Sequence, residues 1–105
     1  MIPPPLLPPL PRRWGSPVER ERRNRILIAV YAYAYEFRSH SLVSDADYDA
    51  LARGINPSLE TGNHALDHFF ANGYSADTGM WIHQHPDLHG IRRIYERYHI
   101  QRDGA

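Results

Sequence analysis

Two short segments of the chain hold the residue types that are best suited to chemistry. The first is an aromatic segment with alternating tyrosines, residues 31–37, and the second is an acidic segment, residues 45–49. Their candidate site residues are Tyr35, Glu36, Asp45, Tyr48 and Asp49. Aromatic rings stack on planar groups, and carboxylates accept hydrogen bonds from hydroxyls and amides. This combination favours the binding of a planar ligand that carries a sugar or an amide, rather than catalysis.

The acidic segment has the spacing of a helix with three side chains on one side. Asp45 and Asp49 are one turn apart, and Tyr48 follows Asp45 by three residues. Two unpaired carboxylates at this spacing repel each other by about 0.2–0.5 kcal/mol. Ligand hydroxyls, an arginine such as Arg38 or Arg53, or solvent would compensate for this repulsion. The alternative is an N-capped, solvated helix with Tyr48 packed inward, which periodicity alone favours.

The two segments together resemble part of a known family. Residues 24–54 are similar to the N-terminal helical domain, called Ia, of NAD-dependent DNA ligases. In that family a Tyr-His pair near the end of a helix precedes an Asp-x-x-Tyr-Asp motif, and this chain matches the spacing without gaps from Tyr35 to Asp49. The resemblance implies that Tyr35 and Tyr48 offer aromatic surfaces to the nicotinamide mononucleotide (NMN) half of NAD, and that Asp45 and Asp49 offer polar contacts.

One position departs from the family pattern, because Glu36 stands where the ligases have histidine. A glutamate there would repel a ligand phosphate by roughly 1 kcal/mol or more. His40 or Arg38 would be the replacement for the lost positive charge, and a phosphate-free ligand, or none, is an equal alternative. The chain also has no Lys, so it lacks the nucleophile for adenylylation. We therefore expect no enzyme and no resident cofactor, with NMN or NAD as the ligand.

The resemblance implies a stand-alone, ligase-related protein of a type found among bacteriophages. The expected function is a non-catalytic binding module for a nicotinamide-type nucleotide, which would act as an accessory or would sequester the nucleotide. The alternative is a small helical protein-interaction or inhibitor protein that keeps the ligase-like helices only as a scaffold.

Charge is unevenly distributed along the chain, although its formal net charge is zero. Residues 1–25 hold six Arg and two Glu, a balance of +4, whereas residues 26–86 hold two Arg and seven acidic residues, a balance of −5. A neutral chain has no overall field that attracts nucleic acid or an anionic membrane, and no apolar run approaches the ~20 residues of a membrane span. The absence of Cys excludes disulfides and is compatible with a cytoplasmic location.

Residues 1–15 are rich in proline, and we expect them to be an extended, disordered tail. Six of the nine prolines lie within residues 1–11, and proline removes backbone donors and fixes φ. Pro8, Pro11 and Arg13 fit a PxxPxR ligand for an aromatic groove. The tail is therefore a candidate contact for a protein partner, although such matches arise often by chance in proline-rich segments.

About four helices are predicted in residues 16–105, which makes the fold class all-α within one small domain. The expected ranges are 16–38, 44–54, 61–72 and 86–99. Ser16 and Glu19 form a capping box at the start of the first helix, and Ser44 caps the second. Residues 80–82 are expected to form a short buried segment.

The first helix is predicted to have one apolar stripe and one solvated face. The stripe consists of Leu27, Val30, Tyr31, Ala34 and Phe37. The solvated face consists of Arg20, Arg22, Arg23 and Arg25. Elsewhere, the histidines at 64, 68, 83, 85 and 89 are numerous enough for a zinc site, but no known signature connects them. No bound metal is expected.

Overall fold

The computed structural model describes residues 15–100, apart from the side chains of residues 99 and 100. Within this range the fold is all-α, as predicted, and contains no strand. Its elements are α1 (Pro17–Arg38), α2 (Asp45–Gly54), α3 (His64–Gly73), the 3₁₀ helix η1 (Met80–Gln84), α4 (Leu88–Tyr95) and the π-helical turn η2 (Glu96–Ile100). None of these helices is both long enough and apolar enough to cross a membrane. The predicted proline-rich tail lies outside the described residues, except for Gly15.

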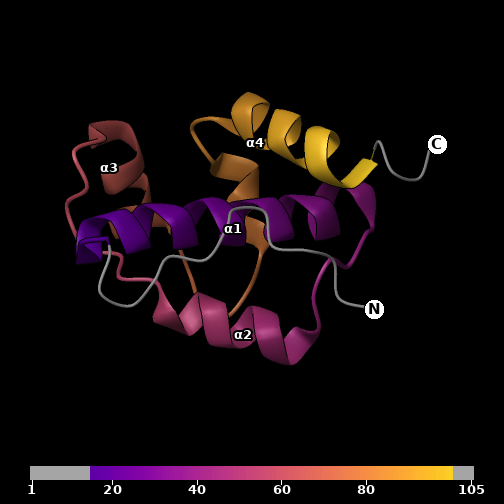
Figure 1. Cartoon of the computed structure of the whole chain (residues 1–105), viewed down its shortest axis with the longest axis horizontal. Helices are drawn as coiled ribbons and strands as arrows, with labels where there is room; N and C mark the ends of the chain where they lie inside the picture. Colours follow the sequence, from indigo (N-terminus) through magenta and orange to yellow (C-terminus); the bar gives the residue numbers. More distant parts are fainter. Residues whose placement is uncertain (1–14, 101–105) are drawn as a thin grey trace.

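The long helix α1 is the centre of the fold. Figure 1 shows α2 on one side of it and α4 on the other, and η1 also packs against it. Its buried apolar residues therefore point in several directions; they are Ile28, Ala29, Val30, Ala32, Tyr33 and Ala34. The prediction of a single apolar stripe is wrong for this reason. Leu27 and Tyr31 are only partly buried, and Phe37 is exposed.

Local capping sets the first residues of α1 and α2, as the sequence predicts. The Ser16 hydroxyl accepts a hydrogen bond from the Glu19 amide at 3.1 Å, and the Ser16 amide donates to the Glu19 carboxylate at 3.2 Å. The Ser44 hydroxyl accepts from the Asp47 amide at 3.1 Å. At the other end of α1, Ser39 adopts a left-handed conformation with φ of 51°. Ser39 and Ser44 thus mark the two ends of the connection between α1 and α2.

The start of α3 lies a few residues later than predicted, because the Asp67 side chain holds the preceding turn outside the helix. Its carboxylate accepts hydrogen bonds from the Thr61 amide at 2.8 Å and from the Thr61 hydroxyl at 2.7 Å. Gly62 then takes a φ of 91°, which favours glycine. Asn63 caps α3 by accepting from the Leu66 amide.

An aromatic core between α3 and η1 fixes the position of η1. The Trp81 ring lies 5.8 Å from that of Phe70 and 5.0 Å from that of Tyr74, measured between ring centroids. Trp81 and Ile82 are buried as predicted, whereas Met80 is exposed. Because η1 also packs on α1, the loop that precedes η1 is held beside the C-terminal half of α1.

The N-terminal half of α1 contains a buried ionic network. Arg25 and Glu21 are 4% and 5% exposed and are joined by a contact of 2.8 Å. Arg25 also pairs with Asp67 at 2.9 Å and donates to the backbone carbonyls of Asn56 and Leu59. The prediction of a solvated face is therefore wrong for Arg25, because the loop between α2 and α3 folds over it and supplies acceptors.

Candidate functional site

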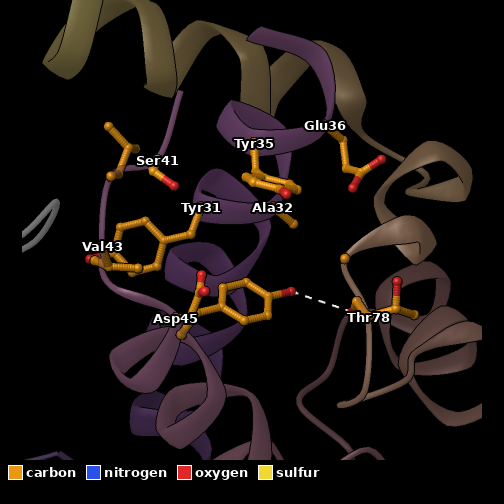
Figure 2. A pocket seen from close by; sticks show the side chains of 11 residues that line it. Tyr31, Ala32, Tyr35, Glu36, Ser41, Val43, Asp45 and Thr78 are labelled. Carbon is orange, nitrogen blue, oxygen red and sulfur yellow. Dashed lines mark hydrogen bonds between the residues drawn. The ribbon is translucent and has the colours of Figure 1, made fainter. Parts of the chain in front are cut away.

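A cavity of about 280 Å³ opens beside the C-terminal half of α1. Residues of α1 line it together with residues 41–43, the first turn of α2, and Thr78 and Gly79 of the loop before η1. Figure 2 shows Ser41, Val43 and Asp45 on one side and Thr78 on the other. The volume lies near the lower end of the range of ~300–1,000 Å³ that is typical of small-molecule sites.

Four of the five predicted ligand residues line this cavity: Tyr35, Glu36, Asp45 and Tyr48. The fifth, Asp49, is not among the lining residues, and its carboxylate forms an exposed ion pair with Arg53 at 3.0 Å. Arg53 is thus one cation that offsets the repulsion between the carboxylates of α2. The spacing in the sequence therefore brings four of these side chains to one open cavity, and their role toward a ligand stays a prediction.

Three tyrosines present rings and hydroxyls to the cavity. Tyr35 is 62% exposed and lies at the opening, whereas Tyr31 and Tyr48 are partly buried. Burial raises the pKa of the Tyr31 phenol above its ordinary value, and the Asp47 carboxylate raises it further. The Tyr31 hydroxyl therefore stays protonated at neutral pH and can donate a hydrogen bond.

Tyr48 is held by the loop before η1. Its hydroxyl donates to the Thr78 carbonyl at 3.5 Å, drawn dashed in Figure 2, which is long for a hydrogen bond. Burial raises the pKa of this phenol, the Trp81 indole N–H offsets part of the rise without meeting the geometry of a hydrogen bond, and the Glu36 carboxylate adds to it. Within residues 15–100 the Trp81 indole nitrogen is buried without a hydrogen-bond partner. The Tyr48 hydroxyl is therefore only weakly engaged by the protein.

Gly79 keeps space open next to the Tyr48 hydroxyl. A Cβ added at this position would lie 3.4 Å from the hydroxyl oxygen and 3.6 Å from the Ala32 Cβ. These are ordinary van der Waals distances, so a small side chain would fill part of the cavity without a clash. Glycine at 79 therefore contributes to the size of the cavity rather than to a special backbone conformation.

Glu36, which stands at the position of the ligase histidine, is paired with His83 of η1. The His83 Nε2 atom lies 3.1 Å from the Glu36 Oε1 atom. The same imidazole packs on Phe37, with ring centroids 4.7 Å apart. The partner of Glu36 thus comes from a distant element and fixes the carboxylate at the wall of the cavity.

The two cations that the sequence suggested beside Glu36 lie elsewhere. The Arg38 guanidinium is 3.9 Å from the Glu96 carboxylate, and the His40 Nδ1 atom is 2.8 Å from the Tyr95 hydroxyl. Neither side chain lines the cavity. The expectation that one of them would replace the family's positive charge is wrong, because both face α4 and the turn that follows it.

The cavity wall is acidic. It contains the carboxylates of Glu36 and Asp45, and no Arg or His is among its lining residues. Asp45 lies in the first turn of α2, where the helix dipole favours a negative charge. A wall of this kind attracts cations and hydrogen-bond donors and repels phosphate.

The histidines have separate local roles in the structure. Among residues 15–100, no three His, Asp or Glu side chains gather in an arrangement that could hold a metal ion. His85 is buried, its ring packs edge-on against Phe69, and its Nδ1 atom accepts a hydrogen bond from the Asp87 amide at 3.0 Å. Burial lowers the pKa of His85, and Asp87 opposes this shift. His85 is therefore a neutral core residue at neutral pH.

Comparison of the chain with protein-family models, with curated proteins and with solved structures gives no match. The resemblance of residues 24–54 to ligase Ia domains therefore rests on the spacing of tyrosines and carboxylates.

Tyr31 and Thr78 are among the lining residues that the sequence did not identify as site residues. Tyr31 lies one helical turn before Tyr35, so the same i, i+4 argument that joined Asp45 to Asp49 could have found it. Thr78, in contrast, comes from a loop 30 residues after Tyr48 in the sequence. Its place depends on the packing of Trp81, and no local pattern signals it.

Proposed function

We propose that the chain is a non-catalytic binding module for a nicotinamide-type nucleotide such as NMN or NAD. The observation that carries the proposal is the convergence of Tyr35, Glu36, Asp45 and Tyr48 on one open cavity. A nicotinamide ring would stack on the tyrosines, and carboxylates would accept hydrogen bonds from the carboxamide and the ribose hydroxyls. The resemblance of residues 24–54 to ligase Ia domains supports the same ligand class.

The size and charge of the cavity favour the nicotinamide riboside portion of the nucleotide. A volume of about 280 Å³ suits one ring and one sugar rather than a whole dinucleotide. Because Glu36 and Asp45 repel phosphate, the phosphate would lie at the opening beside the exposed Tyr35. The protein would thus hold the nucleotide by its nicotinamide end and leave the remainder in solvent.

The absence of lysine excludes adenylylation of a lysine nucleophile by NAD, which is consistent with binding alone. In this proposal the protein sequesters the nucleotide or acts beside a larger enzyme in a reducing, cytoplasmic compartment, as a phage-type accessory would. Incubation with labelled NAD, followed by mass spectrometry of the intact chain, should show no added AMP. An AMP adduct on the chain would overturn the non-catalytic assignment.

Calorimetry with three ligands tests the binding proposal. NMN and NAD should bind, whereas ADP-ribose, which lacks the nicotinamide ring, should not. Replacement of Tyr35 by alanine should weaken NMN binding by about fivefold through the loss of a stacking surface worth ~1 kcal/mol. Met80→Ala is the matched control, because Met80 is similarly exposed, at 58%, but does not line the cavity. Absence of binding at millimolar ligand would contradict the proposal.

One observation favours a second candidate, a small protein-interaction or inhibitor protein. Phe37 of α1 and Met80 of η1 are exposed, and His83 of η1 lies against the Phe37 ring. Exposed apolar side chains on elements that contact each other can contribute to an interface, and the proline-rich tail would add a further contact. This candidate predicts that Met80→Ser abolishes capture of a partner protein and leaves nucleotide binding unchanged.

A further inference from the structure

We propose that the cavity selects its ligand by positive charge, so that it binds oxidised nicotinamide, whose pyridinium ring is cationic, in preference to the uncharged reduced ring. The inference rests on the proposed function and adds to it the redox state of the ligand. It derives from what the wall contains: two carboxylates, three tyrosine rings and no cationic side chain.

The two carboxylates reach the cavity from different elements. Glu36 is on α1 and Asp45 is on α2, so a ligand between these helices lies near both. Glu36 is held by His83, which contacts its Oε1 atom from outside the lining. The nearby arginines are occupied elsewhere, since Arg53 pairs with Asp49 and Arg38 pairs with Glu96. No Arg or His therefore lies between these two acids and a ligand, although His83 pairs with Glu36 from outside the lining.

The tyrosines strengthen the preference for a cation. A positive charge over an aromatic face is attracted by the ring quadrupole, and this attraction grows when water is excluded. Tyr31 and Tyr48 are partly buried, so their faces are less hydrated than that of Tyr35. Burial is the main cause that raises the pKa of each of these two phenols, and a neighbouring carboxylate adds to the rise, Asp47 for Tyr31 and Glu36 for Tyr48. The negative field thus extends to the rings on which the ligand would stack.

Reduction removes the charge but hardly changes the size of the ligand. When the pyridinium ring accepts a hydride, its positive charge is lost while the carboxamide and the ribose remain. The cavity would then keep its hydrogen bonds to the sugar and lose both the attraction to the carboxylates and the cation–π contact. The same field makes the phosphate of NMN unfavourable, so nicotinamide riboside should bind at least as tightly as NMN.

Calorimetry with matched ligand pairs tests the inference on the full chain. Nicotinamide riboside should bind about tenfold more tightly than its dihydro form, and 1-methylnicotinamide should bind more tightly than neutral nicotinamide. The variant Glu36→Gln, which keeps the shape of the side chain, should reduce the tenfold ratio to about threefold or less. Asp45→Asn, at an exposed position, is the second variant if Glu36→Gln fails to fold. Glu60→Gln, in the exposed loop between α2 and α3, should leave the ratio unchanged.

The outcomes separate this inference from the proposed function. Equal affinity for the oxidised and reduced ribosides would overturn charge selection and leave nicotinamide binding standing. Tetramethylammonium serves as a cation without a nicotinamide ring. Suppose that the wild type binds tetramethylammonium but no nicotinamide compound, and that Glu36→Gln loses this binding. This result would overturn the nicotinamide proposal and support a site for another organic cation. If neither class binds at millimolar concentration, both proposals are overturned.

Discussion

The two halves of α1 carry similar residue types and use them differently. In the N-terminal half, Glu21 and Arg25 are buried and meet opposite charges and backbone groups of the protein itself. Beside the C-terminal half, Glu36 of α1 and Asp45 of α2 line an open cavity that has no Arg or His among its lining residues, and His83 contacts Glu36 from outside the lining. The difference teaches that acids near aromatic rings are candidates for ligand binding only where the fold leaves them open to a cavity instead of surrounding them with its own donors.

The largest effect is expected from Arg25→Met, which disrupts the buried ionic network in the N-terminal half of α1. The variant leaves Glu21 buried without its cation and removes the donor to the carbonyls of Asn56 and Leu59. Loss of one partner from a buried pair typically costs ~3–5 kcal/mol of unfolding free energy. Urea unfolding measures this loss. Arg53→Met, in the exposed pair with Asp49, is the control and should cost no more than about 0.5 kcal/mol; equal losses would show that the two pairs do not differ.

The next largest effect should be a loss of folding stability in acid, which arises from the same buried network. Hydrogen bonds from the Thr61 hydroxyl and amide, together with Arg25, lower the pKa of Asp67 from its ordinary 3.8 to about 2. A lowered carboxyl pKa stabilises the folded state above pH ~4, and this contribution is lost as the pH falls toward 2. The free energy of unfolding should therefore drop between these values, as chemical denaturation at each pH would show. Asp67→Asn should be less stable at pH 7 and less dependent on pH; an unchanged slope would exclude Asp67 as a cause.

Substitutions of Tyr48, which lies on α2 and lines the cavity beside the C-terminal half of α1, sharpen the comparison. The Tyr48→Ala variant removes a ring from the cavity and should weaken NMN binding by ~1–1.5 kcal/mol, or about five- to tenfold. Tyr48→Phe keeps the ring and loses only a hydroxyl whose hydrogen bond to Thr78 is long, so its affinity should fall by less than about threefold. Calorimetry on both variants measures these losses. A larger loss for phenylalanine than for alanine would mean that the hydroxyl, and not the ring, recognises the ligand.

The smallest effect is expected from Asp49→Asn. Because Asp49 faces Arg53 and does not line the cavity, the change should alter NMN affinity by less than about twofold. The ligase resemblance alone predicts a contact between this residue and the ligand. Side-by-side titration of Asp49→Asn and Asp45→Asn separates the two expectations, and a greater loss at Asp49 would favour the resemblance over the geometry of the cavity.

The parts of the fold that could be predicted are those that depend on local chemistry. The capping box of Ser16 and Glu19 and the cap at Ser44 act within one turn, so the sequence located the starts of α1 and α2. The start of α3 was misplaced because Asp67 binds Thr61 across the preceding turn. The burial of Arg25 could not be predicted, since the backbone carbonyls that accept from it belong to residues more than 30 positions away.

The cavity, too, could be predicted only where its residues are close to one another in the sequence. Tyr35, Glu36, Asp45 and Tyr48 lie within 14 residues, and helix periodicity around one connection was sufficient to bring them together. The pairing of Glu36 with His83 spans 47 residues, and it depends on how Trp81 anchors η1. Sequence spacing could therefore identify the wall formed by α1 and α2 but not the part formed by the loop before η1.

The most direct test of the contrast between the two halves of α1 is an NMR titration of the ¹⁵N-labelled protein with nicotinamide riboside. Saturable amide shifts are expected at residues 31–36, 41–48 and 78–79, which surround the cavity, while the amides of Glu21, Arg25 and Asp67 stay unchanged. Shifts centred on the buried network, or no saturable shift at millimolar ligand with the protein folded, would contradict the assignment of binding to the acidic cavity.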